Sequence, residues 1–419
     1  MPRFLYTALL FIALPFVPIR LLWRGIKQPE YLKHWNERFG FYTTPANKNA
    51  ENKIIWLHCV SVGETRAAVP LIEALKMRYP NHQILLTHTT PTGRQTSEQL
   101  FGENVQRVYL PYDVPFAVNH FLKHFKPSIG LLMETELWFN LIAVCKRAHV
   151  PLLLVNARLS EKSASGYAKL GSLVQAGLLN LSAIAAQTEM DAVRLQALGA
   201  RNVAVTGNLK FDVKPPVDTL AKGMKLRQLF AEKRTVFLAA STREGEEALI
   251  LDAIKDLDIV TVIVPRHPQR FDEVAAIIEK RNLKYMRRTN IEKPIGSDTK
   301  VVLGNTMGEL FTYYAACDFT FIGGSLLNYG GQNLIEACSV GKPVLIGPHT
   351  FNFAEATKGA LKTGAAILVR SPLELREKIE YLHKNKAEQE KISLAASAFS
   401  QRSAGATARI MQAIEKLPI

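Results

Sequence analysis

The chain has 419 residues, enough to bury a large core and to form two or three domains. Its composition is 47% hydrophobic and 21% charged, which excludes an intrinsically disordered protein. The net charge of +15 predicts anionic partners, but no zinc-finger spacing or RRM-like motif accompanies it, so plain nucleic-acid binding is disfavoured. The four cysteines lie far apart and the ten histidines show no metal-ligand spacing, so we expect neither disulfides nor a structural metal.

An uncharged apolar run, FLYTALLFIALPFVPI, occupies residues 4–19. It is shorter than the roughly 20 residues of a spanning helix, and Pro15 and Pro18 would distort its second half. Positive residues cluster after the run, which places the body of the protein in the cytoplasm. Aromatic and basic residues then alternate in WRGIKQPEYLKHWNERFGFY, as in helices at the headgroup level of a bilayer. We predict an N-terminal membrane-anchor helix over residues 1–24, spanning or lying in the surface; a buried helix capping the first domain is the alternative.

From residue 52 onward, short β-rich runs such as IIWLHCV, IGLLMET and IVTVIVP alternate with helical patterns. Continuous apolar strands separated by helices indicate parallel sheets covered on both faces. A proline-containing segment at 209–219 separates two series of such strands. We therefore predict an α/β protein with two Rossmann-like doubly wound domains, over residues 25–213 and 214–419. The two domains would face a cleft, with ligands at the carboxyl ends of their strands.

Glu64 follows the first of these strands, in the stretch WLHCVSVGETRAA. An acid in the first turn of a helix favours the helix dipole and can cap the helix. The same carboxylate lies at the carboxyl end of a strand and could accept a proton from a substrate hydroxyl. Position alone leaves both interpretations open.

Other polar residues end strands of the first domain. LLMETELW carries Glu134 and Glu136, which alternation places on one side if the strand continues. Two acids at the end of an apolar strand are not easily explained as part of an ordinary solvent-exposed face. Lys210, in TGNLKFD, could neutralise charge on a leaving phosphate or could be an ordinary surface lysine.

The second domain offers anion-binding and ribose-binding patterns. In VPRHPQRF, the prolines stiffen a loop that carries Arg266 and His267, and we assign Arg266 a phosphate contact. Glu309 begins a helical pattern, whose exposed N–H groups could bind anions or base edges. The glycine-rich loop of GGSLLNYGGQNLIEA leads into Asn333 and Glu336, one helical turn apart, where a carboxylate could bind two ribose hydroxyls.

The motifs SVGE, METELW, NARLSEKS, GNLKFD, STREGEE, PRHPQRF, LGNTMGEL and GGSLLNYGGQNLIEA, in this order, resemble the 3-deoxy-D-manno-octulosonic acid (Kdo) transferases, glycosyltransferase family 30. The resemblance covers nearly the whole chain. It implies an inverting GT-B enzyme that moves Kdo from CMP-Kdo to the lipid A precursor (lipid IVA) in lipopolysaccharide biosynthesis. It also implies no cofactor and no metal, and a place at the cytoplasmic face of the inner membrane.

The resemblance further assigns roles to residues that match the family motifs. It implies that Glu64 is the catalytic base and that Glu134 and Lys210 stabilise the transition state. The positions that match the family's CMP-binding segments are Pro265, Arg266, His267, Met307, Gly308, Glu309, Asn333, Leu334, Ile335 and Glu336.

Two alternatives remain beside this prediction. One is another GT-B enzyme that uses a UDP-sugar, such as an N-acetylglucosamine transferase or epimerase, and it would prefer UDP over CMP. The other is a non-catalytic membrane-surface protein that docks through its basic N-terminus. The number of Kdo residues added, the acyl preference of the acceptor and the oligomeric state are not readable from these motifs.

Overall fold

The computed structural model describes residues 1–43, 45, 52–230 and 233–418, and the chain forms two compact units. Unit 1 comprises Met1–Asp212 and Ala404–Ile419, and unit 2 comprises Val213–Ser403. The predicted C-terminal domain was to run from 214 to 419, and this is wrong for residues 404–419, which belong to unit 1. They are held there by hydrogen bonds from the N–H groups of Gly405 and Thr407 to the carboxylate of Asp212. The predicted cleft between the domains stays a prediction.

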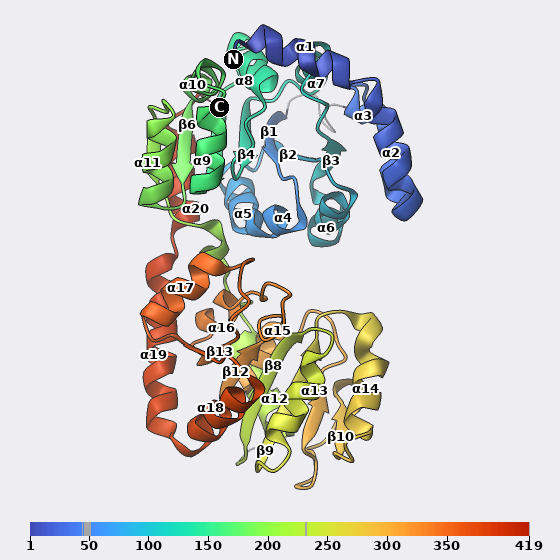
Figure 1. Ribbon diagram of the computed structural model, residues 1–419, viewed down its shortest axis with the longest axis vertical. Coiled ribbons are helices and arrows are strands. Elements are labelled where there is room, and N and C mark those ends of the chain that lie inside the picture. The colour runs from blue at the N-terminus through green and yellow to red at the C-terminus, as the bar shows by residue number, and fades with distance from the viewer. Residues whose placement is uncertain (44, 46–51, 231–232, 419) are drawn as a thin grey trace. The chain divides into compact units, whose positions relative to one another are not determined.

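Unit 1 is built on a parallel seven-stranded sheet (Figure 1), with strand order β3-β2-β1-β4-β5-β6-β7. Its strands are β1 (Lys53–His58), β2 (His82–His88), β3 (Gln106–Tyr109), β4 (Ile129–Met133), β5 (Leu152–Ala157), β6 (Ala183–Ala186) and β7 (Val203–Val205). Its α-helices are α1 (Arg3–Ala13), α2 (Phe16–Lys27), α3 (Trp35–Arg38), α4 (Val62–Ala67), α5 (Val69–Arg78), α6 (Pro91–Phe101), α7 (Pro115–Phe125), α8 (Phe139–Arg147), α9 (Glu161–Ala168), α10 (Ser172–Asn180), α11 (Glu189–Ala197) and α20 (Ala406–Glu415). Short 3-10 helices are η1 (Pro29–Leu32), η2 (Gly102–Asn104) and η3 (Leu209–Asp212).

The apolar strands of unit 1 are buried on both faces because each face is covered by helices. Strand β1 shows this alternation: Ile54 and Trp56 pack with α7, α8, α10 and α11, whereas Ile55 and Leu57 pack with α5 and α20 on the opposite face. The prediction of a doubly wound first domain is confirmed.

Unit 2 contains a second parallel seven-stranded sheet, with strand order β10-β11-β9-β8-β12-β13-β14. Its strands are β8 (Thr235–Thr242), β9 (Ile259–Pro265), β10 (Tyr285–Arg287), β11 (Val301–Leu303), β12 (Phe319–Ile322), β13 (Val344–Ile346) and β14 (Ala366–Leu368). Its helices are α12 (Thr219–Phe230), α13 (Glu246–Ile254), η4 (Pro268–Arg270), α14 (Phe271–Glu279), η5 (Arg288–Asn290), α15 (Leu310–Ala316), α16 (Ile335–Ser339), α17 (Ala354–Lys362), α18 (Pro372–Lys384) and α19 (Lys386–Ser403). Side chains of α13, α14, α18 and α19 share one core with β8, β9 and β12.

The N-terminal segment is two helices instead of the single anchor helix predicted over residues 1–24. Helix α1 ends at Ala13 because Pro15 has no N–H for a helical hydrogen bond, whereas Pro18 lies in the first turn of α2, where no intrahelical donor is needed. Among the described residues, no single helix is long and apolar enough to cross a membrane; α1 and α2 meet that standard only as a pair, with a bend of 55° between them.

Candidate functional site

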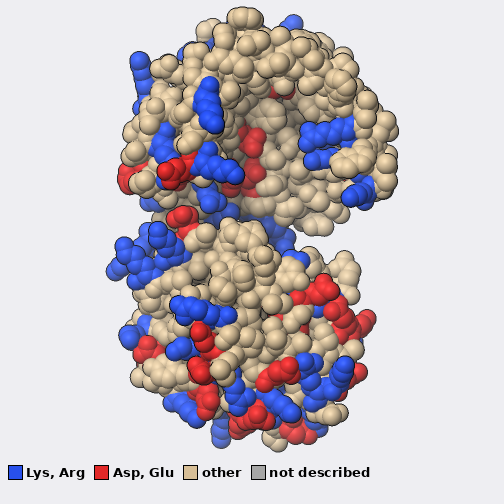
Figure 2. Space-filling model, viewed as in Figure 1, with Lys and Arg blue, Asp and Glu red and all other residues tan. Residues whose placement is uncertain are grey.

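The carboxylates predicted in the first domain lie at one edge of the unit 1 sheet. Strands β1 and β4 are parallel neighbours, with His58 opposite Leu132, so the segments that follow their carboxyl ends lie next to each other. Glu64 comes from α4, which follows β1, and Glu134 and Glu136 come directly after β4. Figure 2 shows acidic side chains inside a hollow on this face of unit 1, with basic side chains at its border.

Glu64 is held in one orientation by the chain around it. The N–H of Val60 donates to its Oε2 at 2.8 Å, and the Ser61 hydroxyl donates to its Oε1 at 2.8 Å. In return, Ser61 Oγ accepts the N–H of Glu64 at 3.3 Å, so the two residues cap α4 reciprocally. The capping interpretation of Glu64 is therefore confirmed.

The same carboxyl group has the ionisation that proton transfer requires. The side chain is 7% exposed, and burial raises the pKa of Glu64 to about 7, with the charge of Glu134 adding to the rise and the hydrogen bonds from Val60 and Ser61 opposing it. A carboxyl group with a pKa near the working pH is well matched to general base catalysis. Capping and catalysis do not exclude each other, since the cap fixes the direction of the carboxylate.

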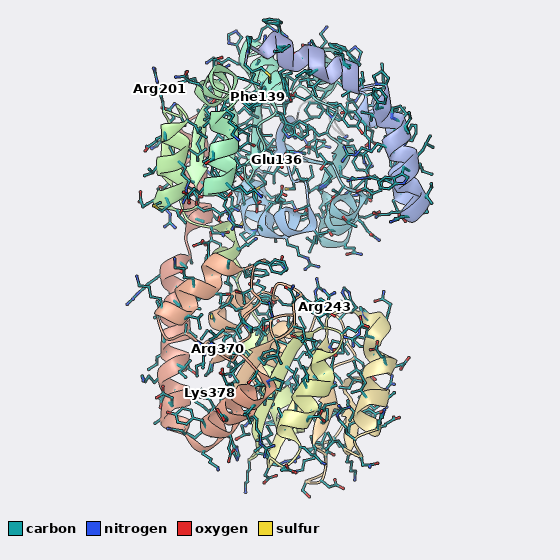
Figure 3. The ribbon with its side chains drawn as sticks, in the orientation of Figure 1. Glu136, Phe139, Arg201, Arg243, Arg370 and Lys378 are labelled. Atoms are coloured by element: carbon teal, nitrogen blue, oxygen red, sulfur yellow. The ribbon has the colours of Figure 1, made fainter. Side chains whose placement is uncertain are left out.

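Glu136 joins this site. Burial, together with the charges of Glu64 and Glu134, raises the pKa of Glu136 to about 7. Figure 3 shows Glu136 near the middle of unit 1. The sequence paired Glu136 with Glu134 at a strand end but did not predict that both would lie near Glu64, because their proximity depends on the pairing of β1 with β4.

Two residues at strand ends adopt a backbone conformation that non-glycine residues rarely take. Glu134 has φ +56° after β4, and Asn156 has φ +56° at the end of β5. Such outliers cluster at functional sites. The Oδ1 of Asn156 accepts the N–H of Leu209 at 3.0 Å, which fixes η3, the helix that carries Lys210. The sequence analysis missed this positioning role, for which NARLSEKS was the signal.

In unit 2, a buried carboxylate joins the loops that follow β8 and β12. Glu246 is fully buried, and it accepts hydrogen bonds from the N–H groups of Arg243 (2.9 Å), Gly324 (2.6 Å) and Leu326 (3.0 Å). Strands β8 and β12 flank the point where the strand order reverses, the usual ligand site in such sheets. We did not select Glu246 from the sequence.

Basic side chains gather beside these loops. Burial lowers the pKa of His267, and the charges of Arg243, Arg266 and Arg270 lower it further, so the four groups lie close together. Arg270 forms an ion pair with Glu247, with 2.7 Å between Nη1 and Oε1. Arg243, labelled in Figure 3, lies over the ring of Tyr329, with 4.5 Å between its Cζ and the ring centroid.

Arg266 Nε donates to Gln332 Oε1 at 3.1 Å. Pro265 ends β9 and is buried.

The segment of Met307, Gly308 and Glu309 follows β11 at the same sheet edge. Met307 is 64% exposed, and Gly308 has φ +81°, a conformation that suits glycine. Glu309 accepts a hydrogen bond from Arg288 Nη2 at 3.1 Å and another from the Thr306 hydroxyl. Its carboxylate is therefore already engaged within unit 2.

The segment from Asn333 to Glu336 lies before and within α16. Asn333 Nδ2 donates to Glu336 Oε1 at 3.1 Å, and Asn333 Oδ1 accepts the N–H of Ile335 at 3.0 Å. The side chains of Leu334 and Ile335 are buried in the core, so only their backbone could meet a ligand. The structure thus collects all the predicted nucleotide-binding segments at the carboxyl edge of one sheet.

The sequence comparisons point to one family. Residues 33–213 match the family model described as 3-Deoxy-D-manno-octulosonic-acid transferase (kdotransferase). The 3-deoxy-D-manno-octulosonic acid transferase of Bordetella pertussis is 43% identical, over 86% of this chain and 86% of its own. The enzyme of that name from Haemophilus influenzae is 35% identical, over 99% of this chain and 98% of its own.

A structural comparison supports the fold. A UDP-GlcNAc 2-epimerase from Neisseria meningitidis, solved bound to UDP-GlcNAc, matches with a TM-score of 0.58 and 17% identity, over 87% of this chain and 100% of its own. At this identity the match shows only that both proteins share the two-sheet architecture predicted as GT-B.

Proposed function

Because the chain belongs to the 3-deoxy-D-manno-octulosonic acid transferase family, we propose that it transfers Kdo from CMP-Kdo to the lipid A precursor lipid IVA. The observation that carries the proposal is the buried Glu64 carboxyl group, with a pKa of about 7, at the carboxyl edge of the unit 1 sheet. No cofactor or metal is needed for the reaction, because a base and a stabilised leaving group suffice for inversion.

Three residues of unit 1, Glu64, Glu134 and Lys210, act in the proposed catalytic step. Glu64 accepts the proton of the acceptor's primary hydroxyl while that oxygen forms a bond to the anomeric carbon of Kdo. The bond from this carbon to the phosphate oxygen breaks on the opposite face, and CMP leaves with the electron pair. Glu134 and Lys210 stabilise the transition state, with Lys210 as the cation for the leaving phosphate.

Unit 2 binds the donor. Arg266 and His267 bind the phosphate of CMP-Kdo, and the basic cluster around His267 suits a donor that carries a phosphate and a carboxylate. Pro265 shapes this loop. Glu336, oriented by Asn333, accepts hydrogen bonds from the ribose hydroxyls.

The remaining donor contacts come from backbone groups. They are supplied by Leu334 and Ile335, whose side chains are buried, and by the segment of Met307, Gly308 and Glu309, in which Glu309 already accepts a hydrogen bond from Arg288. Close approach of backbone to a nucleotide is the usual role of such glycine-containing loops.

We also propose that the N-terminal helices bind the enzyme to the cytoplasmic face of the inner membrane. Helix α1 is tied to unit 1 by a hydrogen bond of 2.8 Å from the Tyr6 hydroxyl to Asp113. Its other side and that of α2 expose large apolar side chains, namely Phe4, Leu5, Leu9, Phe11, Ile12, Phe16, Ile19, Leu22, Trp23 and Ile26. Arg24 and Lys27 line a pocket beside Trp23 and Tyr31, a mixture typical of the headgroup level. The helices would lie in the membrane surface.

The proposal is tested by incubating the purified full chain with a tetraacylated lipid A precursor and CMP-Kdo generated in situ. Products are resolved by mass, which also counts the Kdo residues added. We expect Kdo transfer, and thermal protection of the protein by CMP but not by UDP. A folded protein that makes no product, or that UDP protects instead, would exclude the Kdo transferase and favour a UDP-sugar enzyme.

A further inference from the structure

Arg38, at the end of α3, is a buried cation with unused hydrogen-bond donors. The residue is 4% exposed, and its Nη1 donates to the carbonyl of Thr89 at 3.0 Å. Its Nε and Nη2 are buried and make no hydrogen bond of normal geometry within the described part of the chain, although the guanidinium approaches the hydroxyls of Tyr109 and Tyr112. Burying a charged donor without a partner costs free energy, and a bound anion that accepts its hydrogen bonds would offset this cost.

The acid next to Arg38 is already used. The carboxylate of Glu37 accepts hydrogen bonds from Arg94 Nη1 and from the N–H of Tyr109, each at 2.7 Å. Arg38 and Arg94 both lie over the ring of Tyr109, with their Cζ atoms 3.8 and 5.0 Å from its centroid. With two guanidinium groups and one carboxylate, the cluster keeps an excess positive charge.

Further cations face the same place from α2. Burial raises the pKa of Tyr112, and the positive charges of Arg38, Arg20 and Arg24 oppose this rise, so these side chains lie near its hydroxyl. The N–H of Tyr112 donates to the carbonyl of Arg38 at 2.9 Å. The surroundings of Arg38 are therefore basic on the sides of α2, α3 and α6.

Short contacts connect this cluster to Glu64. Arg38 contacts Thr89, the next residue Thr90 donates from its hydroxyl to the carbonyl of Val60 at 2.7 Å, and the N–H of Val60 donates to Glu64. Strand β3 is two places from β1 in the sheet, so Tyr109 ends roughly 10 Å from the end of β1. A ligand held at Arg38 could therefore present another of its groups to Glu64.

We propose that Arg38, with Arg94 beside it, forms a binding subsite for a phosphate group of the acceptor, and that this contact orients the acceptor's hydroxyl toward Glu64. The Nε and Nη2 hydrogens of Arg38 form the fork that binds two phosphate oxygens. Arg94 is the solvent-facing member, with a side chain 18% exposed. This subsite rests on the proposed function, since it needs a phosphorylated acceptor.

The test compares acceptors and variants. Initial rates are measured with the bisphosphorylated precursor and with two precursors that each lack one phosphate, for wild type, Arg38→Gln and Arg94→Gln. Arg201→Gln is the matched control, because Arg201 is an exposed arginine of unit 1 that Figure 3 shows at its outer side. Folding is checked by thermal unfolding.

We expect that removing one particular phosphate raises the wild-type KM for the acceptor about 10- to 100-fold, as for a lost hydrogen bond to a charged group. Arg38→Gln should raise the KM for the intact precursor similarly and abolish discrimination between the precursors, with the KM for CMP-Kdo unchanged. Arg94→Gln should do the same to a smaller degree, and Arg201→Gln should behave as wild type.

Other outcomes overturn the proposal. Equal wild-type KM values for all three precursors exclude the subsite, even if Arg38→Gln does not fold. A folded Arg38→Gln that keeps wild-type discrimination makes Arg38 a structural residue stacked on Tyr109. If Arg38→Gln instead weakens sedimentation with phosphatidylglycerol vesicles and leaves discrimination intact, the phosphate belongs to membrane lipid. Absence of product from wild type, by contrast, refutes the proposed function itself.

Discussion

Glu64 combines two roles, because the hydrogen bonds that cap α4 also aim its carboxylate. Glu64→Gln keeps an oxygen for the N–H of Val60, so we expect a folded protein whose rate of Kdo transfer falls about 10²- to 10⁴-fold, the usual contribution of a general base. The measurement is the initial rate at saturating substrates. Ser61→Ala is the comparison, since it removes one of the two hydrogen bonds that aim the carboxylate and keeps the base; it should cost about 1 kcal/mol of stability and lower the rate much less than Glu64→Gln. If the two variants lose activity equally, Glu64 acts only as a cap.

The three carboxylates of unit 1 predict how the rate depends on pH. Because the pKa of Glu64 is raised to about 7, the fraction of ionised base, and with it the rate, should rise with pH through about 7 and then level off. Glu134→Gln removes the neighbouring negative charge that helps to raise the pKa of Glu64, so ionisation of Glu64 becomes easier and the midpoint should move to lower pH. Glu73→Gln, an exposed substitution on α5, should leave the midpoint in place. An unchanged midpoint in Glu134→Gln would show that the charge of Glu134 does not act on the base.

A comparison of Glu64 with Glu246 shows what the sequence could reveal about single residues. Both follow the same pattern of strand, Ser, turn, Gly-Glu and helix. In unit 1 the acid is 7% exposed and lies near two other carboxylates, whereas in unit 2 it is fully buried and accepts hydrogen bonds from three backbone N–H groups. Local sequence predicts the place of each acid at a strand end, but its surroundings come from strands far away in the chain.

At the scale of elements, the outer side of α1 and α2 predicts reversible membrane binding. Trp23 and Ile26 are 66% and 81% exposed, and each large apolar side chain contributes about 1.5–3 kcal/mol when fully buried. Replacing both by serine should weaken binding to vesicles that contain anionic lipid at least tenfold, as measured by sedimentation. Met77→Ser, which changes an 84% exposed side chain on α5, should have no effect. Equal binding of both proteins would argue against this surface.

The elements that the sequence predicted best are the central strands, since a short apolar run bounded by turns forms a buried parallel strand in an α/β protein. The N-terminal anchor was predicted less well. Its apolar composition was visible, but its division into α1 and α2 depends on where Pro15 and Pro18 fall relative to a helix end. The hydrogen bond from Tyr6 to Asp113, which fixes α1 on unit 1, joins residues 107 positions apart, and no local pattern encodes it.

At the scale of the molecule, α20 completes the core of unit 1. Ile410 and Ile414 are fully buried among side chains of β1 and α5. Ile410→Ala should therefore lower the stability of unit 1 by about 2–5 kcal/mol. Urea unfolding followed by tryptophan fluorescence measures it directly, because all four tryptophans of the chain lie in unit 1. Leu394→Ala, at an exposed position of α19, is the control, and equal curves for the two variants would contradict the assignment of α20.

The sequence analysis assigned the C-terminal residues to the second domain, because the amphipathic pattern of α20 fits either sheet. The choice is made by contacts at a long distance along the chain, such as that of Arg409 Nε with the carbonyl of Thr206 at 2.8 Å.

The hydrogen bond of 2.6 Å between Gly405 and Asp212 brings together the two points where the chain leaves unit 1 and returns to it. In the language of gene architecture, unit 2 is a domain inserted into a loop of unit 1, with its entry and exit side by side. A coding sequence that joins residue 212 to residue 404 through a few glycines would then encode an uninterrupted unit 1. Unit 1 and unit 2 could then be produced as separate polypeptides, and the binding of acceptor and donor could be titrated on each of them.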